Sequence, residues 1–73
     1  MIGKRKAQAI GRVLTTAQQL DTVRGEHIKL QKILSEKIYY QKNGKWYYEI
    51  QKMKKKTILE LNELAEKIEK SMQ

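Results

Sequence analysis

Apolar residues recur every three or four positions in the first part of the chain. Between residues 4 and 23 they alternate with basic and polar residues, a spacing that places them on one face of an amphipathic helix. Gly25 follows this stretch and suits the left-handed conformation that often ends a helix. A second apolar stripe, which includes Leu30, Ile33 and Leu34, predicts a shorter helix over residues 27–37.

The stretch 38–50 changes this rhythm and holds every aromatic residue of the chain. Its four Tyr and one Trp lie on either side of Asn43-Gly44. An Asn-Gly pair suits the two positive φ angles of a type I′ turn, and aromatic flanks suit β-strands, so we expect a two-stranded hairpin. Trp46 and Met53 also fit a helical spacing. An all-α antiparallel helical hairpin that turns at Asn43-Gly44 is therefore the alternative.

The last segment predicts a helix over residues 57–72. Thr57 and Glu60 have the spacing of a capping box, in which each side chain bonds the other residue's backbone amide. The apolar residues of this helix form an a/d stripe, which we expect to be a homodimer interface: Ile58, Leu61, Ala65, Ile68 and Met72. The predicted fold is a single small domain over residues 1–73, mainly α with one β-hairpin and winged-helix-like in layout.

The size of the chain limits the core that it can bury. A domain near 73 residues buries only about 60% of the surface of its unfolded chain. The absence of Cys excludes disulfides and thiolate metal sites as further sources of stability, so we expect self-association. No apolar run approaches the roughly 20 residues needed to cross a bilayer. We therefore expect a cytoplasmic protein with no membrane partner.

Basic residues outnumber acidic ones, and the excess is unevenly placed. The chain has 16 Lys and Arg against 8 Asp and Glu, a formal net charge of +8. Residues 1–56 hold fourteen basic and four acidic residues, whereas residues 57–73 hold two and four. A basic surface on a small chain is typical of proteins that bind phosphate backbones, although a lysine-rich surface also simply keeps a protein in solution.

Residues suited to catalysis are scarce. His27 is the single His, its neighbour Glu26 points about 100° away on a helix, and no second His or Cys completes a metal site. The sequence has no Gly-rich phosphate-binding loop and no carboxylate pair on an apolar background. We therefore expect no enzymatic activity, no metal and no cofactor.

The stretch around the predicted turn combines aromatic and basic residues. We expect Lys42 and Lys45, which flank the turn, to reach phosphate groups. Alternate side chains of a strand face opposite ways, so one face can pack on helices while the other stays exposed. We expect Trp46, Tyr39 and Tyr48 to provide aromatic contacts to unpaired bases or to a protein partner.

Residues 30–64 resemble the second half of winged-helix repressors of the ArsR type. The resemblance rests on one string, which is similar to the turn and second strand of the wing in that family: Asn43-Gly44-Lys45-Trp46-Tyr47-Tyr48-Glu49-Ile50. It implies a recognition helix that carries Lys29 and Lys32. It also implies a wing that carries Lys42 and Lys45, and a dimer interface within residues 58–72.

Two classes of function follow from these features. The first is a small DNA-binding protein, with DNA favoured over RNA, whose affinity comes mainly from phosphate contacts and which acts as a transcriptional regulator. Its expected contacts are seven basic residues: Lys29, Lys32, Lys42, Lys45, Arg5, Arg12 and Arg24. The second is a non-enzymatic protein-interaction module, an adaptor or inhibitor for an acidic partner, anchored by the Tyr/Trp cluster.

Overall fold

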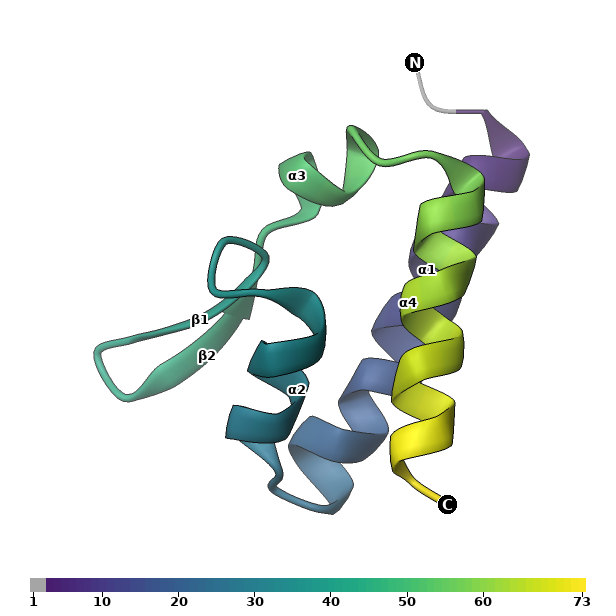
Figure 1. Ribbon diagram of the computed structural model, residues 1–73. Helices are drawn as coiled ribbons and strands as arrows, with labels where there is room; N and C mark the ends of the chain where they lie inside the picture. The colour runs from purple at the N-terminus through teal and green to yellow at the C-terminus, as the bar shows by residue number, and fades with distance from the viewer. Residues whose placement is uncertain (1–2) are drawn as a thin grey trace.

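The computed structural model describes residues 3–73 as helices joined by a single β-hairpin (Figure 1). In chain order the elements are α1 (Lys4–Gln18), the π-helix η1 (Gln19–Val23), α2 (His27–Leu34), β1 (Tyr39–Lys42), β2 (Lys45–Tyr48), α3 (Ile50–Lys54) and α4 (Ile58–Ser71). The prediction of a mainly helical chain with one antiparallel hairpin is confirmed. No helix in this part of the chain has both the length and the apolar character needed to span a membrane.

Helices α1 and α4 lie side by side and run in the same direction (Figure 1). Each turns its apolar stripe toward the other, because residues three and four positions apart share one helix face. Val13 and Ala17 of α1 and Leu61 of α4 have no exposed surface. Leu30, Leu34, Ile38, Tyr39 and Met53, from the segment between the two helices, complete this core.

The central part of the apolar stripe of α4 is used inside the chain, which corrects the prediction that its residues contact a second copy. Leu61, Ala65 and Ile68 are fully buried, because α1 and the rest of the core cover them. Ile58 is 40% exposed, and Met72 packs on the edge of the core. The three central residues of the stripe therefore have no surface to offer to a second copy of this fold.

The predicted helix over residues 4–23 is present, and its last turn is the π-helix η1. Gly25 follows with φ 67°, the left-handed conformation expected of it. The Glu26 amide donates to the Leu20 carbonyl at 2.8 Å and closes the turn that leads into α2. The wide π-turn leaves Asp21 within hydrogen-bond distance of side chains from α2 and the hairpin.

The β-hairpin forms as predicted, so the all-α alternative is wrong. Strands β1 and β2 pair antiparallel, with Lys42 opposite Lys45 beside the turn. Asn43 and Gly44 have φ 53° and 79°, the two positive angles that a type I′ turn requires. In Figure 1 the hairpin projects away from the α1–α4 pair, with α2 near its base.

Helix α3 was not predicted from the sequence. The prediction extends the hairpin to residue 50 and expects no helix between the hairpin and residue 57. Met53 of α3 is fully buried, and Ile50 packs on the edge of the core. A five-residue helix is too short to be stable by itself. Tertiary contacts with α1 therefore hold α3, and the local sequence pattern does not reveal them.

The capping box at the start of α4 is confirmed. The Glu60 amide donates to Thr57 Oγ1, and the Thr57 amide donates to Glu60 Oε1, each at 3.1 Å. The hydrogen bond from the Thr57 amide stabilises the ionised carboxylate and lowers the pKa of Glu60. The box fixes the first turn of the helix that supplies half of the α1–α4 core.

Ser35 ends α2 three residues before the predicted end of that helix. Its φ of 81° and ψ of 156° lie in a backbone region that is essentially restricted to Gly. The Ser35 carbonyl accepts hydrogen bonds from the amides of Ile38 and Tyr39 at 3.2 and 3.0 Å, which lead the chain into β1. The hairpin therefore begins from a strained residue.

We expect Ser35→Gly to raise the free energy of unfolding by about 1 kcal/mol, because Gly adopts this conformation without the strain that a Cβ causes. Urea denaturation followed by circular dichroism measures the change. Ser71→Gly is the matched control, since Ser71 lies in the last turn of α4 and the same exchange there should lower stability. A Ser35→Gly variant no more stable than the wild type would contradict the expectation.

Candidate functional site

The two faces of the hairpin carry different side chains. Pairing places Tyr40 opposite Tyr47 and Lys42 opposite Lys45. Because alternate residues of a strand share a face, these four side chains lie on one face, which we call the outer hairpin face. The opposite face carries Tyr39, Gln41, Trp46 and Tyr48, and three of these residues pack in or against the core: Tyr39, Trp46 and Tyr48.

Three aromatic rings join the hairpin to the start of α2. The rings of His27 and Tyr39 have centroids 6.5 Å apart and an interplanar angle of 17°, and Trp46 stacks on both. Its centroid lies 4.9 Å from that of His27 and 4.8 Å from that of Tyr39, at interplanar angles of 4° and 14°. Aromatic pairs at such distances stabilise by roughly 0.5–1.5 kcal/mol beyond the burial of their surface. The stack therefore holds the hairpin against the first residue of α2.

A polar cluster around Asp21 extends this stack toward η1. Asp21 Oδ1 lies 2.9 Å from His27 Nδ1, and the Tyr48 hydroxyl donates to Asp21 Oδ2 at 3.1 Å. The Tyr39 hydroxyl lies 2.9 Å from the same His27 nitrogen. Burial, together with the neighbouring Asp21 carboxylate, raises the pKa of both tyrosines. The carboxylate partner of His27 is thus Asp21, six residues earlier, and not the adjacent Glu26 that the sequence draws attention to.

The three aromatic contacts predicted from the sequence all lie on the inward face. Tyr39 has no exposed surface and cannot contact a partner, which corrects that prediction. Trp46 and Tyr48 are half-buried. Trp46 also lines an open hollow of about 550 Å³, together with Gly25, Glu26, His27, Ile28, Lys29 and Gln41.

The outer hairpin face contains an aromatic pair that the sequence prediction did not select. The rings of Tyr40 and Tyr47 stack with centroids 5.9 Å apart and an interplanar angle of 29°. Tyr47 is 42% exposed, although it is a large aromatic residue. The missed signal is the alternation along a strand: once Tyr39 and Tyr48 point inward, their neighbours Tyr40 and Tyr47 must point outward.

Lys42 and Lys45 lie beside this pair, as predicted, at the tip of the hairpin. Both are exposed, and neither forms an ion pair or a side-chain hydrogen bond within residues 3–73. The two lysines face each other across the strands, and like charges in that position are destabilising. The tip of the hairpin is therefore a position at which an anion would stabilise the protein.

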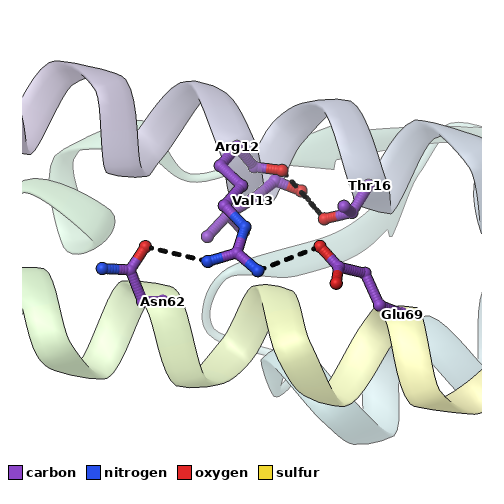
Figure 2. Close-up of polar contacts among 5 residues, drawn as sticks. All are labelled: Arg12, Val13, Thr16, Asn62 and Glu69. Carbon is purple, nitrogen blue, oxygen red and sulfur yellow. Dashed lines mark hydrogen bonds and ion pairs between the residues drawn. The ribbon is translucent and has the colours of Figure 1, made fainter.

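Arg12, another predicted phosphate contact, instead joins α1 to α4. Its guanidinium donates to Asn62 Oδ1 at 3.3 Å and to Glu69 Oε1 at 3.1 Å. Figure 2 shows the guanidinium between the two helices, with one partner on either side. Thr16, one turn further along α1, bonds back to the carbonyls of Arg12 and Val13 at 2.9 and 3.0 Å. Arg12 is thus engaged within the chain.

Arg24 and Lys29 bond the C-terminal end of α4. Arg24 donates to the Met72 carbonyl at 3.0 Å, and Lys29 donates to the Ser71 carbonyl at 2.7 Å. The last carbonyls of a helix lack partners within it and carry partial negative charge, so cations stabilise that end. Three of the seven predicted nucleic-acid contacts, Arg12, Arg24 and Lys29, therefore hold α4 in place.

The remaining predicted contacts, Arg5 and Lys32, are exposed and lie on α1 and α2. Arg5 lines a shallow hollow between the first turns of α1 and α4. Lys32 lines another hollow beside α2. The structure thus does not gather all seven basic residues on one surface.

The lysines that lead from the hairpin into α4 were not selected from the sequence. Helix α3 and the residues after it carry Lys52, Lys54, Lys55 and Lys56. With the hairpin they belong to one stretch, residues 37–56, that holds seven Lys and a single Glu. The signal was present as a run of lysines, but its position beside a folded hairpin depends on α3 packing against α1.

No group of three or more His, Cys, Asp and Glu side chains suited to a metal ion occurs among residues 3–73. The chain matches no protein-family model, no curated protein and no solved structure. The outer hairpin face is therefore the candidate site on its geometry and charge: two aromatic rings and two unpaired cations on one exposed surface.

We expect Arg12→Ala to lower the free energy of unfolding by about 0.5–1 kcal/mol, because both side-chain bonds to α4 are lost and exposed pairs contribute about this much. Urea denaturation at low and high salt measures the loss, which salt should reduce by screening the Glu69 pair. Arg5→Ala removes the same charge from the same helix without removing such a bond, and should change stability by less than about 0.5 kcal/mol. Equal losses in both variants would rule out the role assigned to Arg12.

The raised pKa values of Tyr39 and Tyr48 predict a loss of stability in alkali. Their folded-state pKa values lie above the unfolded value of about 10, so the stabilisation is fully present below pH 10 and declines as the pH rises beyond it. Each tyrosine contributes a slope that rises toward an upper limit of about 1.4 kcal/mol per pH unit as its unfolded-state hydroxyl ionises. Urea denaturation at several pH values from 8 to 11.5 measures the slope.

Tyr48→Phe should make this alkaline slope shallower, and Tyr47→Phe serves as its control because that hydroxyl lies on the outer hairpin face. Identical slopes for the wild type and Tyr48→Phe would show that the Asp21 cluster does not control the ionisation of Tyr48.

Proposed function

We propose that this protein binds nucleic acid, with DNA favoured, through phosphate contacts made by the tip of its hairpin. The observation that carries this proposal is the outer hairpin face, where Lys42 and Lys45 lie opposite each other, exposed and without an ion pair in residues 3–73. Phosphate groups neutralise such lysines, and the release of condensed counterions drives binding. The protein would act in this way as a small cytoplasmic regulator.

The distribution of charge supports an approach through the hairpin. Residues 37–56 carry seven Lys and one Glu, whereas residues 57–73, which include α4, carry four Glu and two Lys. Figure 1 shows the hairpin and α4 on opposite sides of the molecule. Repulsion of phosphate by α4 and attraction by the lysine-rich stretch would turn the hairpin toward a nucleic acid.

The position of the hairpin supports a wing-like use. It projects from the helical body directly after α2 and leads through α3 into the long helix α4 (Figure 1). Lys32 is exposed and provides a third cation, on the helix α2 that precedes the hairpin. Lys29 does not share this role, because it bonds the end of α4. The proposed contacts are therefore fewer than the sequence predicts, and they centre on the hairpin tip.

Fluorescence anisotropy of a labelled mixed-sequence duplex, titrated at several salt concentrations, tests the proposal. We expect Lys42→Ala/Lys45→Ala to weaken binding to every sequence alike and to reduce the slope of log affinity against log salt by about 2, close to one unit for each lost phosphate contact. Lys67→Ala/Lys70→Ala is the matched control, since it removes two exposed lysines from α4 and the same total charge.

Equal effects of the two double variants would show that only net charge matters and would remove the hairpin from the interface. An absence of binding at low salt would overturn the proposal. The second candidate function, a protein-interaction module, would then rest on the hollow beside Trp46, where Ile28 is 60% exposed.

A further inference from the structure

We infer that the outer hairpin face binds single-stranded nucleic acid by stacking an unpaired base on Tyr47. Tyr40 supports the Tyr47 ring from the other strand, and Lys42 and Lys45 contact the phosphates that flank the base. This inference rests on the proposed function and specifies the form of nucleic acid that the site prefers.

The stacked tyrosine pair provides a rigid platform. Tyr40 and Tyr47 are direct partners across the two strands, and their rings lie 5.9 Å apart at 29°. The Tyr47 ring stacks on its partner, and the residue is still 42% exposed, so it has surface left for a second stacking partner. Every base has a π-face, so such a platform accepts unpaired bases with little regard to sequence.

The neighbouring lysines complement a nucleic-acid strand. Lys45 and Tyr47 lie two residues apart on β2, about 7 Å along the strand, and their side chains point the same way. A base on Tyr47 would therefore have its backbone beside Lys45 and, across the turn, Lys42. Repulsion between these two lysines is relieved when a phosphate lies between them. None of the four residues of the outer hairpin face is acidic.

A duplex does not satisfy the same surface. Its bases are stacked on one another and present only their edges in the grooves. The exposed group of this site is the face of the Tyr47 ring, which needs the face of a base as its partner. A duplex can still use the lysines, because its phosphates are exposed. The tyrosine pair therefore distinguishes single strands from duplexes, and the lysines do not.

The site is already held in place before a ligand arrives. On the inward face, Trp46 stacks on His27 and Tyr39, and Tyr48 bonds Asp21. These contacts fix the strands to the helices, so the hairpin is already folded before a ligand binds. A preorganised site loses less affinity to ordering than a flexible one.

An abasic oligonucleotide separates stacking from phosphate contacts. A labelled 12-nucleotide dT strand and a 12-nucleotide strand of abasic sites carry the same phosphates, and only the former has bases. We expect the wild-type protein to bind the dT strand at least about fivefold more tightly at the same salt concentration, since stacking on one aromatic ring gives at least this factor. Tyr47→Leu should remove the difference, and Tyr47→Phe, which keeps the ring, should retain it. Circular dichroism of each variant checks the fold.

The outcomes distinguish this inference from the proposed function. Equal binding of the dT and abasic strands by the wild type would overturn the stacking inference and leave phosphate binding intact. The same conclusion follows if Tyr47→Leu, correctly folded, keeps its preference for the dT strand. Binding to neither strand nor to a duplex at low salt would overturn both. An unchanged affinity of Tyr47→Leu for the mixed-sequence duplex would support the assignment of the ring to unpaired bases.

Discussion

The position of the hairpin depends on the contacts that the Asp21 carboxylate makes. A two-stranded hairpin is marginally stable by itself and needs packing against another element. Asp21 receives the Tyr48 hydroxyl from β2 and lies beside His27 of α2, whose ring supports Trp46. One side chain at the end of the first helical segment thus connects three elements. The wide turn of η1, where Asp21 lies, is the local structure that makes this contact geometrically accessible.

Basic residues have two kinds of surroundings in this protein. Arg12, Arg24 and Lys29 neutralise the negative charge of α4, from the Glu69 carboxylate to the last carbonyls of the helix. Lys42 and Lys45 extend from the hairpin and have no such partner in residues 3–73. A net charge of +8 therefore overstates the charge that is available for binding, because part of it stabilises the fold.

The local elements were predictable from the sequence because each has its own short-range cause. Three of these features occur where the sequence predicts them: the Asn43-Gly44 turn, the capping box at Thr57 and the left-handed conformation of Gly25. The short helix α3 was not predictable, because the burial of Met53 against distant residues stabilises it. The packing of one helix against another was not predictable from the local sequence either. An apolar stripe indicates that a helix packs against another element. The stripe of α4 does not indicate whether that element is α1 or a second copy of the chain.

The candidate site shows the same division. Strand alternation was known in advance, and the lysines at the tip are exposed as expected. Which tyrosines point outward depended on the register of the strands and on the side that packs on α2, and neither is encoded locally. Tyr39 and Tyr48 were therefore predicted as contacts, whereas the outer hairpin face carries Tyr40 and Tyr47.

The parallel arrangement of α1 and α4 has a consequence for how this chain folds. Because the two helices run in the same direction, the chain must return through α2, the hairpin and α3 before α4 can begin (Figure 1). The bonds from Arg12 close loops of 50 and 57 residues. Such distant contacts form late and slow the folding of a small domain. During synthesis the part of α1 that packs on α4 remains uncovered until α4 has been added, and in that interval the nascent chain is exposed to aggregation and to chaperones.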